Sequence, residues 1–320
     1  MRAFARAVSG FASSSGANGR LQVLLYHRVH PVADPLRPGD VDVERFEWQM
    51  EVVARYFTPL AVDEALTLLN SGKLPPNAVC VTFDDGYADN VELALPVLRR
   101  WKVPATFFLT TGFLSNGCMW NDRVIEALRE VDEPRLDLSK LGLGEYELTS
   151  PGARLEMVNS VLNKLKYYPR TERDGYVRDL EEFLNTQVTY TPMMGEHHIT
   201  ALVNAGMMVG AHTINHPILN ELSPEEARHE IECGKKQLED LIDKEVTLFA
   251  YPNGIPGKDY GDEHVDMVRR AGFSAAFSTT WAAARRADDF FQLPRVGSWE
   301  KTRLRFYLRL LKNYRITNSE

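Results

Sequence analysis

The chain has 320 residues, 44% of them hydrophobic, and a formal net charge of −7, and it has no apolar run near the roughly 18 residues that a membrane span needs. This is ordinary globular composition, and the net acidity argues against a general nucleic-acid binder. Cys80, Cys118 and Cys233 lie far apart with no C-x-x-C pair, which excludes a disulfide framework and a cysteine-built zinc finger. A bound metal would therefore need histidine and carboxylate ligands.

The first 20 residues are rich in Ser, Gly and Ala and carry early arginines. Arg6 interrupts what would be the apolar part of a secretory signal. We therefore predict a flexible leader over 1–20 and a cytoplasmic protein, with an inefficient export signal as the alternative.

Short apolar runs alternate with helix-like segments, which is typical of buried parallel strands joined by helical crossovers. Helices are predicted over 43–57 and 91–101. Ser223 and Glu226 form a capping box, which predicts the start of a further helix. The predicted strands cover 21–26, 79–83, 105–109, 207–211, 246–251, 273–277 and 292–296. Seven such units predict an α/β fold, a deformed (β/α)7 barrel whose chemistry lies at the C-terminal ends of its strands.

One interval, residues 118–200, is far longer than a crossover needs. It is predicted to form helices over 122–131, 153–166, 171–185 and 196–205. We interpret it as a helical insertion within a barrel of residues 21–299. The insertion would be a lid or substrate wall, or else a packing layer without a role in binding.

A basic helix and tail are predicted over 300–320, which carry six basic and two acidic side chains. Leu304, Leu308 and Leu311 recur there at helical spacing. One interpretation is peripheral contact with an anionic membrane surface or glycan. The other, which we favour, is a helix docked by its leucines with a solvated basic face.

Two carboxylates follow the second predicted strand in the run TFDDG, residues 82–86. Adjacent residues at a strand end diverge, so one carboxylate could bind a metal while the other reaches a water beside it. Two anions this close are costly without a nearby cation. The alternative for an isolated Asp-Asp-Gly is an ordinary loop turn.

Two histidines, His212 and His216, follow the fourth predicted strand in the run GAHTINHP. The four-residue spacing puts both imidazoles on one side of a turn, where they could hold a borderline cation. Two histidines and one carboxylate leave positions open for water and substrate, which is typical of a catalytic metal site.

These motifs, followed by FAYPNG at 249–254, resemble the polysaccharide deacetylases of carbohydrate esterase family 4. The resemblance spans roughly residues 21–297. It implies a hydrolase that uses a divalent metal, usually zinc, to remove acyl groups from N-acylated amino sugars. By position in the motifs, it implies that the metal ligands are Asp85, His212 and His216 and that the general base is Asp84. It also implies that the backbone N–H of Asn253 donates to the oxyanion.

Two features depart from the commonest pattern of the family. In the family an arginine usually orients the catalytic Asp, but the corresponding position here is Ala250. We assign that role to Arg295; the alternative is that Arg295 has only a structural role at the barrel rim. The C-terminal Leu-x-His motif that carries the general acid is absent, since the last histidine is His264.

We assign the general acid to His27, which ends the first predicted strand. The first and last strands are neighbours in a closed barrel, so His27 could occupy the place of the missing histidine and protonate the departing amine. A subgroup that acts on exopolysaccharide N-acetylglucosamine resembles this chain in its N-terminal Tyr-His and its FAYP. The alternative is a histidine that is merely hydrogen-bonded at a strand end.

Aromatic rings suit the apolar faces of sugars, and we predict substrate contacts from Tyr251 and from Trp120, near the start of the insertion. Trp281 and Trp299 could also stack on a sugar, although core or rim packing is the simpler interpretation of any single one.

We predict metal-dependent removal of an N-acetyl group from an amino sugar of a cell-surface polysaccharide or its precursor. The alternatives are deformylation of a lipid-linked amino sugar and a catalytically silent carbohydrate-binding protein. The presence of Asp84, which metal binding does not need, favours the enzyme.

Overall fold

A computed structural model describes residues 14–115, 117–186, 188–297 and 299–316. The chain forms two compact units. The first comprises the described parts of Met1–Val32, Gly39–Ser115 and Met194–Glu320, and the second those of Ala33–Pro38 and Asn116–Met193.

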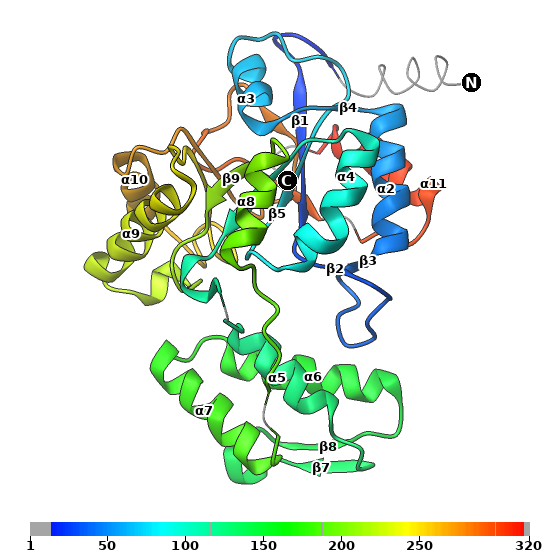
Figure 1. The fold of residues 1–320 in the computed structure, drawn as a ribbon, viewed down its shortest axis with the longest axis vertical. Coiled ribbons are helices and arrows are strands. Elements are labelled where there is room, and N and C mark those ends of the chain that lie inside the picture. The colour runs from blue at the N-terminus through cyan, green and yellow to red at the C-terminus, as the bar shows by residue number, and fades with distance from the viewer. Residues whose placement is uncertain (1–13, 116, 187, 298, 317–320) are drawn as a thin grey trace. The chain divides into compact units, whose positions relative to one another are not determined.

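The first unit is built on a curled sheet whose principal strands are parallel (Figure 1). In spatial order they are β13 (Val296–Gly297), β1 (Arg20–Tyr26), β5 (Ala78–Phe83), β6 (Ala105–Leu109), β9 (Met208–Ala211), β10 (Leu248–Ala250) and β11 (Ala275–Phe277). A parallel bridge from Phe277 to Leu293 brings the sheet back towards β13. The predicted deformed (β/α)7 barrel is confirmed, and its first and last strands are neighbours.

Several two-residue strands were not expected, because so short a segment carries no periodic pattern. They are β2 (Val29–His30), β3 (Val41–Asp42), β4 (Thr58–Pro59) and β12 (Ala284–Arg285). β4 pairs with β5 and β12 pairs antiparallel with β1, while β2 and β3 pair with each other.

Amphipathic helices surround this sheet (Figure 1). They are α2 (Val43–Tyr56), α3 (Val62–Asn70), α4 (Leu95–Trp101), α8 (Glu196–Asn204), α9 (Pro224–Ile242), α10 (Asp262–Arg270) and α11 (Arg303–Asn313), with 3-10 turns η2 (Thr111–Phe113) and η4 (Leu219–Glu221). The capping box of Ser223 and Glu226 begins α9 as predicted. The helix expected over 91–101 begins instead with a π-helical turn, η1 (Asn90–Ala94).

The sheet separates two apolar clusters, because successive side chains of a strand point to opposite faces. Inside the barrel lie Val23, Cys80, Phe108, Leu248 and Phe277, together with apolar residues of α3. Beneath the outer helices lie Leu24, Val81, Phe107 and Phe249. The strand ends are therefore held rigidly by packing on both faces.

The second unit has its own apolar core. It contains α5 (Trp120–Arg129), α6 (Pro151–Leu165), α7 (Arg170–Phe183), the 3-10 turn η3 (Ser139–Leu141) and a hairpin of β7 (Arg135–Asp137) and β8 (Glu145–Glu147). Residues 33–38 join it through ion pairs such as Arg129 with Asp34 at 2.6 Å.

This unit differs from the predicted insertion over 118–200. Its hairpin breaks the expected all-helical pattern. The fourth expected helix, α8, belongs to the first unit, because Ile199 and Leu202 are buried in the cluster beneath the outer helices. A helical pattern reveals an apolar face but not which core receives it.

The two ends of the chain also differ from expectation. Residues 1–13 of the predicted flexible leader lie outside the described residues. The Gly16 N–H donates to the Leu74 carbonyl at 2.8 Å, so the chain near Gly16 is held against the barrel. α11 docks through Phe306 and Leu310, while Leu304 and Leu308 are exposed.

Arg303 and Arg309 of α11 form ion pairs with Glu51 and Glu300. Among the described helices, none is long and apolar enough to cross a membrane. Contact with a membrane surface through α11 stays a prediction.

The packing inside the barrel can be tested at Gly210 on β9. A Cβ there would lie 2.5 Å from the Phe108 ring, so we expect Gly210→Ala to lower the free energy of unfolding by about 1–3 kcal/mol through overpacking. Denaturant titration measures this. Gly175→Ala on α7, where an added Cβ meets nothing within 4 Å, is the matched control, and an equal loss in both variants would contradict the argument.

Candidate active site

Three predicted side chains converge at the C-terminal ends of β5 and β9. Asp85 Oδ1 lies 3.5 Å from His212 Nε2 and 3.4 Å from His216 Nε2. One ligand atom from each residue lies within 4.8 Å of the others. Asp85 and His212 are buried. The structure thus brings the three predicted metal ligands together.

The donor atoms of this cluster fit a divalent cation. Asp85 Oδ1 is buried without a hydrogen-bond partner among the described residues, which is costly for a charged oxygen. His212 Nδ1 lies 2.7 Å from the Ala250 carbonyl, which can only accept, so Nδ1 carries the proton and Nε2 presents a lone pair towards Asp85. A cation would satisfy both atoms.

Two of the three side chains are held in the form that ligates a metal. For the third, His212, burial alone would lower the pKa, but the Asp84 and Asp85 carboxylates outweigh it and raise that pKa. Burial lowers the pKa of His216 to about 4, against the opposing effect of the Asp85 carboxylate. Burial alone would raise the pKa of Asp85, but His212 and His216 outweigh it and hold that pKa below its ordinary value. A neutral imidazole and an ionised carboxylate are the forms that ligate metals.

The turn that carries both histidines is fixed by α9. The Glu230 carboxylate accepts from two successive N–H groups of the turn at 2.9 and 2.8 Å and from the Asn215 side chain at 2.6 Å. Thr213 Oγ1 accepts from the His216 N–H at 3.1 Å. A Cβ on Gly234 would lie 2.9 Å from the Thr213 backbone, so only glycine permits this approach.

Glu230 and Gly234 were not identified from the sequence. Both lie on the buried face of α9 with Ala227, Ile231 and Leu238, and a carboxylate at helical spacing among apolar residues is the signal that could have revealed Glu230.

Asp84 is held by a two-point contact with Arg295. Its two carboxylate oxygens accept from Arg295 Nη1 and Nη2, each at 2.7 Å, and Arg295 Nε donates to the Ser278 carbonyl at 3.1 Å. Asp84 is 2% exposed and Arg295 1%. Burial alone would raise the pKa of Asp84, but Arg295 and then His212 outweigh it and lower that pKa. The structure therefore places the Arg295 guanidinium on Asp84, the contact that its predicted role requires.

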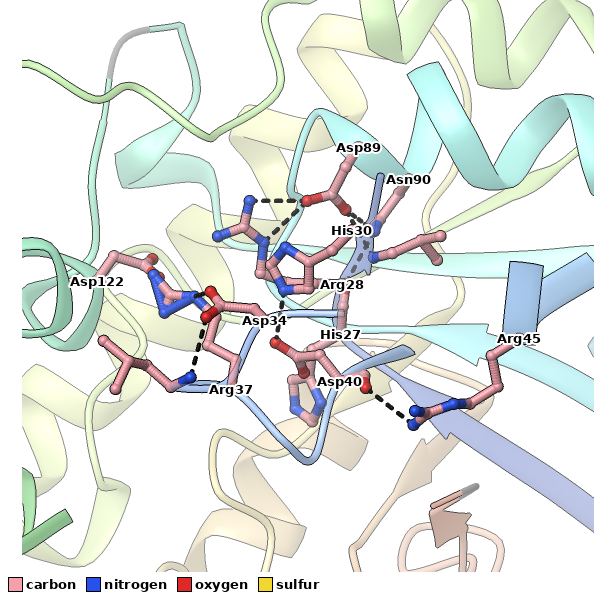
Figure 2. Close-up of polar contacts among 12 residues, drawn as sticks. His27, Arg28, His30, Asp34, Arg37, Asp40, Arg45, Asp89, Asn90 and Asp122 are labelled. Carbon is pink, nitrogen blue, oxygen red and sulfur yellow. Dashed lines mark hydrogen bonds and ion pairs between the residues drawn. The ribbon is translucent and has the colours of Figure 1, made fainter. Parts of the chain in front are cut away.

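The exposed His27 follows β1 directly, and its backbone is clamped. Asn90 Nδ2 donates to the His27 carbonyl at 2.8 Å and to Asp89 at 2.9 Å. Asp89 also accepts from the Val29 N–H at 3.1 Å and from Arg28 at 2.8 Å. Figure 2 shows the Asp89 carboxylate between Arg28 and Asn90. The π-helical turn η1 thus fixes the strand end that carries His27.

Asn253 lies on the turn after β10, with a left-handed φ of 58°. Its carbonyl accepts from Thr279 Oγ1 at 2.8 Å. Its N–H has no acceptor among the described residues, so it could donate to a substrate.

The two residues predicted to contact substrate through aromatic rings, Tyr251 and Trp120, differ in their surroundings. The Tyr251 side chain is fully buried, stacks on Tyr260 at 3.7 Å and donates to the Phe291 carbonyl at 3.0 Å. The prediction that this side chain binds substrate is wrong, because its ring and hydroxyl are used by the core. Trp120 belongs to the second unit, where Arg173 lies 4.7 Å over its ring, so it is not part of the unit that carries the other site residues.

The comparisons with known proteins agree with this geometry. The sequence profile of the polysaccharide deacetylase family matches residues 71–136 and 176–276, more than half of the chain. The chain belongs to the polysaccharide deacetylase family. Deacetylases of this family depend on a metal and act on N-acetylated polysaccharides. In this chain Asp85, His212 and His216 form a group that could hold a metal ion.

The relatives share modest sequence identity. The chain is 21% identical over 279 residues to YxkH of Bacillus subtilis, whose name describes it as a polysaccharide deacetylase. The match covers 87% of this chain and 71% of the relative. Over 103 residues it is 31% identical to the poly-beta-1,6-N-acetyl-D-glucosamine N-deacetylase of Staphylococcus aureus. That match covers 32% of this chain and 33% of the relative.

Solved structures share the fold. The deacetylase PplD of Streptococcus pyogenes, in complex with acetate, superposes with a TM-score of 0.61 at 18% identity over 91% of this chain and 98% of its own. IcaB from Ammonifex degensii gives a TM-score of 0.59 at 20% identity over 92% of this chain and 98% of its own.

The ligand set can be tested by metal titration in a calorimeter. We expect His212→Ala to weaken divalent-metal binding by more than about 100-fold, since one of three ligands is lost. Even the loss of a residue that only hydrogen-bonds to a metal ligand typically lowers metal affinity by about 10–100-fold. Asp84→Asn should keep the affinity within a few-fold. His197→Ala, an exposed histidine, is the control. Unchanged binding in His212→Ala would refute the ligand set.

Proposed function

We propose that this family member is a zinc-dependent N-deacetylase that removes acetyl groups from an amino sugar of a cell-surface polysaccharide or its precursor. The observation that carries this proposal is Asp84, held at both oxygens by Arg295 beside the Asp85, His212 and His216 cluster. A carbohydrate-binding protein that only held a metal would have no use for so costly a buried carboxylate.

The metal would be held by Asp85 Oδ1, His212 Nε2 and His216 Nε2, a mixed nitrogen and oxygen set that suits zinc. When bound, it would polarise the amide carbonyl and make water a better nucleophile.

Asp84 would take the proton from the attacking water. Arg295 keeps the carboxylate ionised and fixes its direction, yet occupies only one lone pair on each oxygen. The remaining lone pairs are available to the water. The backbone N–H of Asn253 would stabilise the oxyanion, in line with the general need for a preorganised donor.

His27 would protonate the departing amine. Its ring is exposed, and it lines the same cavity as Arg295. Since Arg295 contacts Asp84 directly, the proposed acid and base lie on neighbouring walls of the site. The clamp by Asn90 would hold His27 in place during the transfer.

The base can be tested with Asp84→Asn. We expect kcat to fall by about 10²–10⁴-fold, the usual worth of general base catalysis, with the metal retained. Arg295→Lys should lower kcat as well, because a lysine cannot hold both oxygens of Asp84. Acetate release from N-acetylated glycans measures both effects, and circular dichroism confirms folding. Full activity of Asp84→Asn would remove it from the mechanism.

The acid can be tested with His27→Ala. The rate should fall by about 10²–10⁴-fold, the usual contribution of general acid catalysis, and the pH profile of kcat should change. Asn90→Ala should lower kcat by a smaller factor and keep the pH profile. His197→Ala is the matched control. A His27→Ala enzyme with an unchanged rate and pH profile would move the acid to another residue.

The acyl group can be identified from the same assays. Acetate release from oligosaccharides of N-acetylglucosamine supports the proposal. Formate release from N-formylated amino sugars without acetate release would replace it with a deformylase, and release of neither acid by the metal-loaded protein would favour a binding protein.

A further inference from the structure

Arg173 on α7 of the second unit is a buried arginine without a carboxylate partner. The residue is only 8% exposed. No carboxylate of the described residues lies within ion-pair distance of its guanidinium, whereas Arg123 on the neighbouring α5 binds both oxygens of Glu181. Buried charges are normally paired, because an unpaired one loses its hydration without compensation. The guanidinium of Arg173 therefore lacks the anion that its position calls for.

The Arg173 guanidinium is held so that one of its edges stays free. Nη1 donates to the Lys166 carbonyl at 3.4 Å, and Cζ lies 4.7 Å from the centroid of the Trp120 ring. A cation over an indole face is attracted by the ring, so this contact helps to fix the plane of the group. Nε and Nη2 have no hydrogen-bond partner among the described residues; Nε is buried, whereas Nη2 keeps some contact with solvent. These two nitrogens present a rigid pair of N–H donors.

The surroundings of this edge favour an anion. Trp120 is the first residue of α5, which has no side-chain N-cap, and helix side chains lean towards the N-terminus. The guanidinium over the Trp120 ring therefore lies near the positive end of the helix dipole. Asp122, in the first turn, is bound by Arg37 at 2.9 Å. Burial lowers the pKa of Arg173, and the nearby Asp174 carboxylate opposes this only in part, so the charge of Arg173 is not neutralised.

We propose that the second unit binds an oxyanion, a carboxylate or a phosphate group, on the Nε and Nη2 edge of Arg173. Both groups present two oxygens that match a guanidinium edge through two parallel hydrogen bonds. The backbone N–H groups of Trp120 and Asn121 also have no acceptor among the described residues and add donors at the same helix end. The anion is either free or carried as an acidic substituent on a glycan. The site lies in the second unit, and its existence does not depend on the proposed deacetylase activity.

The Trp120 indole gives a readout at the site itself. The chain has five tryptophans, so protein made with ¹⁵N-labelled tryptophan should show five indole N–H resonances, and the one lost in Trp120→Phe belongs to Trp120. The metal-loaded full-length protein is titrated with inorganic phosphate, acetate, glucuronic acid and glucose. We expect phosphate or the carboxylates to shift the Trp120 resonance to saturation. Glucose, which has no anionic group, should leave it unchanged.

Variants at Arg173 separate the fork from its charge. Arg173→Gln should weaken anion binding at least about ten-fold, as expected for the loss of charge-assisted hydrogen bonds. Arg173→Lys keeps the charge but not the two-donor edge, and it should bind more weakly than the unaltered protein. Arg178→Gln, which removes an exposed arginine from the same helix, is the matched control and should keep the affinity. Circular dichroism checks that each variant is folded.

The four tryptophans of the first unit control for general effects of salt. A Trp120 resonance that none of the anions shifts, or that shifts with the same affinity in Arg173→Gln, would overturn the site. Shifts confined to the other indoles would show that the anions bind elsewhere and would also overturn it.

The set of probes identifies the source of the anion. Tighter binding of glucuronic acid than of acetate supports an acidic substituent carried on a sugar, and tighter binding of acetate or phosphate supports a free anion. Acetate release from N-acetylated glycans tests the proposed function separately, so the failure of one proposal is distinguishable from the failure of the other.

Discussion

The buried contact between Asp84 and Arg295 is the constraint on which the site depends. It joins residues 211 positions apart, one after β5 and the other before β13, which lie on either side of β1. The pair forms only if the sheet curls so that its last strand returns to its first. Removing one partner of a buried ion pair typically costs about 3–5 kcal/mol, so the closure of the barrel and the direction of the proposed base depend on each other.

Several residues around the same centre have a strained backbone. Asp85, Thr213, His216 and Asn253 all adopt left-handed φ values between 52° and 77°, which non-glycine residues rarely do. Such residues cost of order 1–3 kcal/mol each and persist where the surroundings hold them. Here the Glu230 carboxylate and the close approach of Gly234 supply that hold for the histidine turn. These contacts hold the histidine turn in its left-handed conformation.

The fold was largely predictable because buried parallel strands read as short apolar runs, and both carboxylates and both histidines directly follow such runs. Arg295 could be inferred from a gap, since Ala250 occupies the position of the usual arginine. In the structure the backbone carbonyl of Ala250 orients His212, a contact that does not depend on the side chain at that position.

What the sequence did not reveal depends on contacts between distant segments. A pattern shows that Tyr251 follows a strand but not that Tyr260 stacks on it in the core. The apolar face of α8 gives no sign of which unit buries it, and Leu304 and Leu308 of α11 give no sign that Phe306 and Leu310 dock instead. The contact between the Trp281 and Trp299 rings likewise exists only after folding.

The central claim is that one metal is held by two imidazoles and one carboxylate. X-ray absorption spectroscopy of the zinc-loaded protein tests it most directly. We expect a first shell of nitrogen and oxygen at about 2.0–2.2 Å with the outer-shell scattering of two imidazoles, and the loss of one imidazole in His216→Ala. Sulfur at about 2.3 Å, or a shell without imidazole, would contradict it.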